Sequence, residues 1–184
     1  MNNKIQISSP LSTEIIKQLR AGDRVLISGT IYVARDAAHR RLIEALDRGD
    51  KLPFELKTQT IYYMGPSPAK PGQIIGAAGP TTSTRMDVFT PRLLEAGLRA
   101  MIGKGNRSQE VRDALKRYQA VYFVTTGGTG ALLAKTIKKV ELIAYEDLGA
   151  EAILRLDVID FPAIVADDIY GNDLFEIGRS KYQR

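Results

Sequence analysis

The hydroxyl-rich loop at residues 79–87 carries the densest set of groups that could bind an anion. It contains a Gly-Pro turn, four consecutive hydroxyl residues from Thr81 to Thr84, then Arg85 and Asp87. An apolar run precedes it, and Thr90 with Pro91 follows as a typical helix start. We therefore expect hydroxyls, loop N–H groups and a guanidinium to converge on an anion between a strand and a helix. A solvated Ser/Thr-rich turn is the alternative.

Two more cations occupy similar places in the chain. Arg35 follows a strand-like run and precedes Asp36, a good N-cap for the next helix, while Lys104 lies between two glycines ahead of a helix capped by Ser108. Ligands of layered α/β proteins gather at such strand-to-helix junctions. Arg35, Arg85 and Lys104 could thus clamp a small dicarboxylate from one rim of a sheet. A surface ion pair is the alternative for Arg35.

Two other chemical candidates are weaker. His39 falls inside the helix that follows Asp36, which favours a partly buried or surface histidine, with a general base as the alternative. The glycine-rich turn at residues 127–130 lacks the G-x-G-x-x-G spacing because Leu133 takes the last position. We expect a tight turn there, or a loop that touches the same anion. The glycines around Lys104 do not form a phosphate-binding P-loop.

Composition limits the classes of function. The 184 residues suit one domain, residues 1–184, and contain no cysteine and one histidine. This excludes disulfides, a cysteine nucleophile and a thiolate or classical zinc site within the chain, so no metal ligand is assigned to it. The net charge of +5 comes from scattered basic residues, which favours an anionic small molecule or an acidic partner surface over nucleic acid. With no apolar signal or membrane-spanning run, we expect a cytoplasmic protein without membrane contact.

Hydrophobic periodicity predicts a mixed α/β chain with more strand than helix. Residues 1–10 read as a short strand or tail, Gly29 as the break between two strands, and residues 65–72 as a long loop within one domain. The expected strands are 24–28, 30–34, 60–64, 98–102, 120–125, 140–145, 152–158 and 163–166. The expected helices lie around residues 11–19, after Asp36, and at 91–96, 108–118 and 131–137.

Several of these segments resemble one known family. Residues 28–39, 79–87 and 104–108 look like the β subunit of class I fumarate hydratase, a family shared with the L(+)-tartrate dehydratase β subunit. The resemblance extends through residues 127–128, 146–152, 160–163 and 171–173, and so covers nearly the whole chain. The family pattern often has Ala-Gly where this chain has Ser83 and Thr84, which adds bulk beside Arg85.

The resemblance implies a swivelling β/β/α domain with mixed sheet layers and short crossover helices. It implies a hydro-lyase that interconverts fumarate and L-malate; the alternatives are L(+)-tartrate dehydratase and a non-catalytic dicarboxylate-binding module. It also implies a [4Fe-4S] cluster held by cysteines of a partner α subunit, in a heteromer of the α2β2 type. By motif, Arg35, Arg85 and Lys104 would bind the substrate carboxylates, and Thr81 would be the catalytic base.

Overall fold

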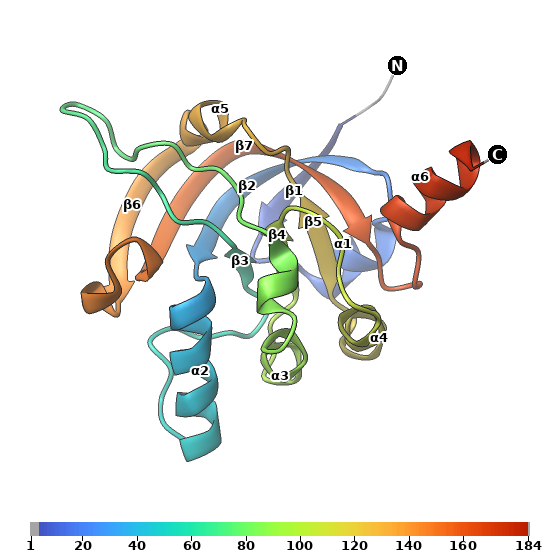
Figure 1. The fold of residues 1–184 in the computed structure, drawn as a ribbon, viewed down its shortest axis with the longest axis horizontal. Coiled ribbons are helices and arrows are strands. Elements are labelled where there is room, and N and C mark those ends of the chain that lie inside the picture. Colours follow the sequence, from blue (N-terminus) through green and yellow to red (C-terminus); the bar gives the residue numbers. More distant parts are fainter. Residues whose placement is uncertain (1–3, 184) are drawn as a thin grey trace.

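A computed structural model describes residues 4–183 as a strongly curved sheet with several of the helices packed against one side (Figure 1). The predicted strand or tail at residues 1–10 falls partly on residues 1–3, which lie outside the described residues. The strands are β1 (Ile5–Ser9), β2 (Arg24–Val33), β3 (Thr60–Tyr62), β4 (Ala100–Gly103), β5 (Val121–Val124), β6 (Ile137–Ala144) and β7 (Ile153–Asp167). The α-helices are α1 (Thr13–Gln18), α2 (Asp36–Arg48), α3 (Thr90–Glu95), α4 (Gln109–Tyr118), α5 (Gly130–Ala134) and α6 (Leu174–Tyr182). Two 3₁₀ turns complete the set, η1 (Ser83–Met86) and η2 (Glu146–Glu151).

The sheet closes on itself. Across residues 4–183 its seven strands run in the order β1-β2-β3-β4-β5-β7-β6, and β2 also pairs with β7. The strands from β2 to β5 are parallel to one another, whereas β7 is antiparallel to both β2 and β5. β2, β3, β4, β5 and β7 therefore form a ring. The predicted mixed α/β architecture, with sheet layers and short helices, is confirmed.

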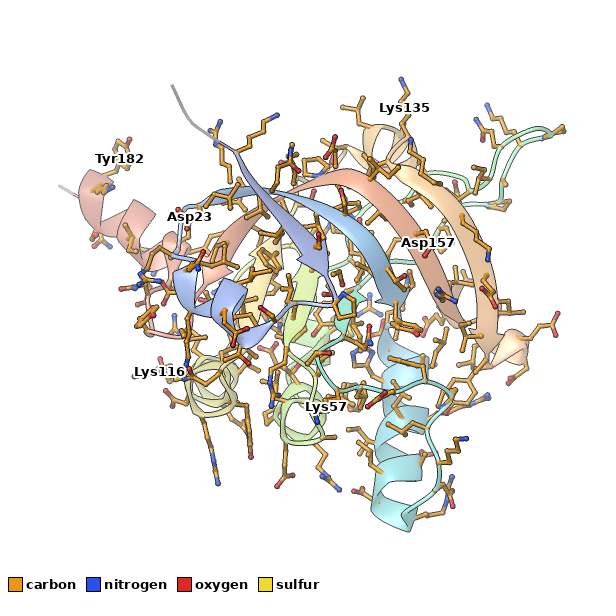
Figure 2. The ribbon with its side chains drawn as sticks, turned by 180° about the vertical axis from the view of Figure 1, so that it is seen from behind. Asp23, Lys57, Lys116, Lys135, Asp157 and Tyr182 are labelled. Atoms are coloured by element: carbon orange, nitrogen blue, oxygen red, sulfur yellow. The ribbon has the colours of Figure 1, made fainter. Side chains whose placement is uncertain are left out.

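Alternation along the central strands divides the apolar side chains between two cores. The first core lies inside the ring and includes Tyr62 and Met64, from β3 and just after it. The second core lies between the sheet and the helices and includes Ile61 and Tyr63. β4 and β5 follow the same period of two, as expected for strands buried on both faces. The helices α2, α3 and α4 lie side by side over the second core (Figure 1). In Figure 2, Lys57 and Lys116 lie on this helical side and Lys135 on the opposite side.

The two longest strands continue through residues that were expected to break them. Gly29 does not end β2, and β7 is one strand where the sequence suggested two. Each strand has an irregularity, and the two lie opposite each other. The pairing register between β2 and β7 shifts after Ile27 in β2, and Asp160 in β7 has a φ of 53°. The Asp160 N–H then donates to Ser28 Oγ at 3.0 Å. Such bulges bend a strand and increase its twist without ending it, which helps the ring to close.

The C-terminal helix was not predicted. The last expected helix lay at residues 131–137, but α6 begins at Leu174. Its N-cap is Asp173, whose carboxylate accepts the Phe175 N–H at 2.7 Å. No helix among residues 4–183 is both long and apolar enough to cross a membrane.

Candidate functional site

The carboxyl ends of the parallel strands place the predicted residues on one rim. The Thr81 N–H donates to the Tyr63 carbonyl, just past β3, at 2.8 Å. Ser83 and Lys104, just past β4, exchange two bonds: the Ser83 N–H donates to the Lys104 carbonyl at 3.0 Å, and the Lys104 N–H to Ser83 Oγ at 3.1 Å. The hydroxyl-rich loop is thereby fixed beside the end of β4, where Thr82 and Lys104 form an isolated bridge.

Arg35 and Arg85 meet at a shared carboxylate. Arg35 lies between β2 and α2, and Arg85 lies in η1. Asp36 Oδ2 is 3.1 Å from Arg35 Nε, and Asp36 Oδ1 is 2.9 Å from Arg85 Nε. The structure thus brings together two cations separated by 50 residues in sequence, as the clamp hypothesis requires. Half of the Arg85 side chain is exposed, whereas that of Arg35 is 21% exposed.

The local setting of Arg85 differs from the prediction. The apolar residues before the loop form no regular strand; Ala78 instead donates its N–H to the Gly130 carbonyl at 3.0 Å. Pro80, which has no N–H, joins Met64 only through an isolated bridge. Arg85 therefore follows a loop and lies inside a 3₁₀ turn. Thr90 is also the first residue of α3 rather than its N-cap, and its hydroxyl donates to the Met86 carbonyl at 2.8 Å.

The start of α2 is capped from another part of the chain. Asp36 was predicted as the N-cap, but Arg35 occupies that position and Asp36 is the first helical residue. Glu151, at the end of η2, supplies the missing acceptor: its Oε2 takes the Ala37 N–H at 2.8 Å, and its Oε1 lies 3.1 Å from Arg35 Nη2. Sequence reasoning missed the role of Glu151 because the contact spans more than 110 residues.

Lys104 lies at the edge of a concave region of about 550 Å³. Its side chain is exposed, and within residues 4–183 it makes no ion pair. The glycine-rich turn lines the same region, and a Cβ built on Gly127 would lie 3.9 Å from Lys104 Cδ. The turn therefore lies beside Lys104, whereas Arg35, Thr81 and Arg85 do not line this concave region.

Thr81 is half-buried, and its hydroxyl has no hydrogen-bond partner among residues 4–183. Arg85 follows Thr81 by four residues, and the adjacent Thr82 forms an isolated bridge with Lys104. A threonine hydroxyl needs a nearby group to take its proton before it can act as a base. The described residues leave the hydroxyl available to a ligand.

His39 does not reach the rim. It was expected to be partly buried or on the surface, but it is fully buried, with its ring centroid 5.3 Å from that of Tyr63 and 5.9 Å from that of Phe89. Neither ring nitrogen has a partner within the described chain, and burial lowers the pKa of His39 to about 4. The ring stays neutral near pH 7 and packs in the core, away from any solvent-accessible ligand.

A buried arginine supports the loop from below and was also missed. Arg107 donates from Nε to Asp87 Oδ1 and from Nη2 to Thr90 Oγ1, both at 2.7 Å. Its guanidinium stacks over the ring of Tyr122 at 4.8 Å. The Tyr122 hydroxyl lies 2.8 Å from Ser83 Oγ, which links this buried group to the rim. Next to Ser108 in sequence, Arg107 gave no signal that separated it from a surface cation.

Comparison with known proteins agrees with the resemblance. A family model described as "Fumarase C-terminus" matches residues 1–178. The chain belongs to the fumarase C-terminus family. "Fumarate hydratase class I, aerobic" of Salmonella typhimurium is 42% identical to it over 178 residues, which is 94% of this chain. "Putative L(+)-tartrate dehydratase subunit beta" of Methanocaldococcus jannaschii is 38% identical over 181 residues, 95% of this chain.

The relatives differ in how much of their own length the match covers. This fumarase C-terminus chain spans 30% of the Salmonella typhimurium protein and 31% of "Fumarate hydratase 2" of Leishmania major, to which it is 39% identical. It spans 93% of the Methanocaldococcus jannaschii subunit. The family thus includes longer proteins and at least one protein of about this length.

Proposed function

We propose that this chain is the β subunit of a hydro-lyase that interconverts fumarate and L-malate, and that residues 1–184 act as one swivelling domain. The observation that carries the proposal is the convergence of Arg35 and Arg85 at Asp36, on the rim that also holds Thr81 and Lys104. Membership of the fumarase C-terminus family supports the reaction class.

In this proposal the cations bind a dianionic substrate and stabilise charge as it develops. Removal of the proton beside one carboxylate of malate moves negative charge onto that carboxylate, where Arg35, Arg85 and Lys104 would hold it. Guanidiniums favour paired contacts to a carboxylate, while lysine acts as a point charge. Thr81 would take the proton as an alkoxide, after a group on the partner subunit or on the substrate had accepted its hydroxyl proton.

The residues of this chain fit the substrate and not an iron–sulfur cluster. The sequence has no cysteine, and no group of three His, Asp or Glu side chains within residues 4–183 is arranged to hold a metal. We propose that cysteines of an α subunit hold a [4Fe-4S] cluster, which supplies a Lewis acid for the departing hydroxyl. The two subunits would form an α2β2 heteromer in the cytoplasm.

Dehydration of L(+)-tartrate is the second candidate. It is favoured by the Methanocaldococcus jannaschii relative, because that protein is named as a separate β subunit and has nearly the length of this chain. Both candidates use the same rim and the same charges. They differ in a second substrate hydroxyl, so the preference would lie with side chains near Ser83 and Thr84 and with the partner.

Anaerobic co-expression with a candidate α subunit, followed by assays of fumarate and tartrate, tests the proposal. We expect the chain alone to fold, to carry no iron or sulfide and to show no hydratase activity. Addition of the cluster-loaded partner should restore turnover, with saturation near one partner per chain. Robust fumarate hydration by the isolated, iron-free chain would show that the split-site proposal is wrong.

A further inference from the structure

Asp36 uses both of its carboxylate oxygens on the two proposed substrate arginines. Oδ1 pairs with Arg85 Nε at 2.9 Å, and Oδ2 pairs with Arg35 Nε at 3.1 Å. Both contacts are made through Nε, at the inner end of each guanidinium. The two terminal nitrogens of Arg85 make no hydrogen bond within residues 4–183, so they can donate to an incoming carboxylate.

A second carboxylate fixes Arg35 further. Glu151 Oε1 pairs with Arg35 Nη2 at 3.1 Å, while Glu151 Oε2 accepts the Ala37 N–H at the start of α2. The remaining nitrogen, Arg35 Nη1, lies against Gly65, where an added Cβ would be only 2.6 Å away. Arg35 is therefore paired through two of its three nitrogens and Arg85 through one. The turn that carries Glu151, between β6 and β7, lies beside the start of α2 (Figure 1).

The two carboxylates offset an electrostatic cost of placing two arginines at one binding site. Two guanidiniums that bind one small dianion repel each other, and each free arginine side chain loses conformational entropy when it is fixed. A carboxylate between them offsets the repulsion and fixes both side chains before the ligand arrives. Because Asp36 and Glu151 together carry two negative charges against the three of Arg35, Arg85 and Lys104, the group keeps a net charge of +1 to attract a dianion.

We infer that Asp36 is a positioning residue that sets the mutual orientation of Arg35 and Arg85 for a dicarboxylate, with Glu151 as a second anchor for Arg35. The expected effect on catalysis rests on the proposed function. The positioning of the two arginines by Asp36 does not depend on that function. Asp36 does not touch the substrate; it acts through the two arginines. Arg85 offers its terminal nitrogens as a pair, whereas Arg35 offers mainly Nη1 beside Gly65.

The test measures the arginines directly and then the enzyme. In the full chain, the Nε–H NMR signals of Arg35 and Arg85 should both shift in Asp36→Asn, which keeps the shape and removes the charge. Asp50→Asn is the matched control, since Asp50 Oδ2 pairs with Arg48 Nε at 2.7 Å near the other end of α2. That control should shift only Arg48. Glu151→Gln should shift Arg35 and leave Arg85 unchanged, and it provides the test if Asp36→Asn does not fold.

In the assembled enzyme, Asp36→Asn should lower kcat/KM by roughly 10- to 100-fold, mainly through kcat, as expected when binding groups remain but are misaligned. Asp36→Glu should recover part of the loss, and Asp50→Asn should show none. Unchanged Nε–H signals in Asp36→Asn would overturn the inference, as would a variant that loses thermal stability but keeps normal kinetics. If the wild-type assembly converts neither fumarate nor tartrate, the proposed function is wrong, and the NMR shifts still decide the positioning role.

Discussion

Two arginine–carboxylate clusters flank the hydroxyl-rich loop, and they differ in how far water reaches them. The open cluster consists of Arg35, Arg85, Asp36 and Glu151, with the Arg85 side chain 50% exposed. The closed cluster consists of Arg107, Asp87, Thr90 and Tyr122, with the Arg107 side chain 0% exposed. The residue types are similar, so the environment determines the role. Buried groups that pair within the chain hold the backbone, whereas accessible groups with spare donors can bind a ligand.

The closed cluster fixes the loop on either side of Arg85. Asp87 accepts from Arg107 Nε and, through Oδ2, from the Ser108 N–H at 2.7 Å. On the other side, Ser83 is tied to Lys104 and to the Tyr122 hydroxyl. Arg85 therefore extends from a short segment held at both ends. A cation on such a segment is preorganised, because its backbone does not have to move when the ligand binds.

The largest effect is expected from breaking the closed cluster. Arg107→Ala leaves Asp87 nearly buried without its charge partner and should destabilise the fold by about 3–5 kcal/mol. Urea unfolding of the full chain, followed by circular dichroism, measures this. The exposed Arg92, which pairs with Glu95 at 3.0 Å, is the matched control, and Arg92→Ala should cost less than about 1 kcal/mol. Equal stability of the two variants would contradict a supporting role for Arg107.

Breaking the open cluster should affect turnover rather than folding. Arg85→Ala and Arg35→Ala should each lower kcat of the assembled enzyme by about 100-fold or more, as for loss of a preorganised donor. Their free energies of unfolding should stay close to that of the wild type, since partly exposed ion pairs contribute about 1 kcal/mol or less. Steady-state kinetics and urea unfolding are compared for each variant. Near-normal activity in both, with assembly confirmed, would show that the clamp hypothesis is wrong.

Thr81→Ala tests which group on the rim takes the proton. We expect turnover to fall by about 100-fold, with the affinity for substrate changed less than tenfold, because a base acts mainly in the transition state. Thr82→Ala, which removes an exposed hydroxyl from the same loop, is the control. Full activity of Thr81→Ala together with loss of activity in His39→Ala would transfer the role to His39.

The smallest effect concerns the buried ring of His39. Its pKa of about 4 in the folded chain lies below the usual 6.5, so the unfolded chain binds more protons and His39 costs stability as the pH falls from 6.5 toward 4. His39→Leu should therefore gain about 1 kcal/mol relative to the wild type between pH 7.5 and 5.5. The measurement is the difference between the two proteins at each pH. A constant difference would indicate a solvent-accessible ring.

This comparison between proteins is needed because a second buried group titrates in the opposite sense. Burial, together with the negative charge of Asp173, raises the pKa of Asp167 to about 7. The folded chain then binds more protons than the unfolded chain, so this carboxyl costs stability as the pH rises from about 4 to 7. In the wild type, the pH dependences of stability that come from His39 and Asp167 oppose each other. Comparison with His39→Leu isolates the contribution of His39.

Local sequence was enough to place two of the four site residues, Arg35 and Lys104, at junctions between a strand and a helix. Hydrophobic periodicity located β2, α2, β4 and α4, and Ser108 caps α4 as expected, with its hydroxyl accepting the Val111 N–H at 3.3 Å. Periodicity and helix capping depend on residues only a few positions apart in sequence. Arg35 and Lys104 were therefore assigned to the correct kind of junction, and the resemblance added Thr81.

The features that the sequence did not predict depend on contacts between segments far apart in the chain. Nothing near Arg35 in sequence indicates that Glu151 caps the same helix, and nothing near Arg107 indicates that it is buried over Tyr122. His39 was misjudged for a similar reason, since a helix that packs on a second core hides one whole face. Ring closure likewise requires β7 to pair with β2, and no periodicity within either strand reveals its partner.

That closing pair also has a consequence for biosynthesis. β2 ends at Val33, but its partner in β7 begins at Ile153, so most of the chain must leave the ribosome before the two can pair. Until then one edge of β2 and one edge of β5 are open to other strands. A nascent chain stopped before β7 should already carry Arg35, Thr81, Arg85 and Lys104, yet it should aggregate, because unpaired strand edges recruit each other.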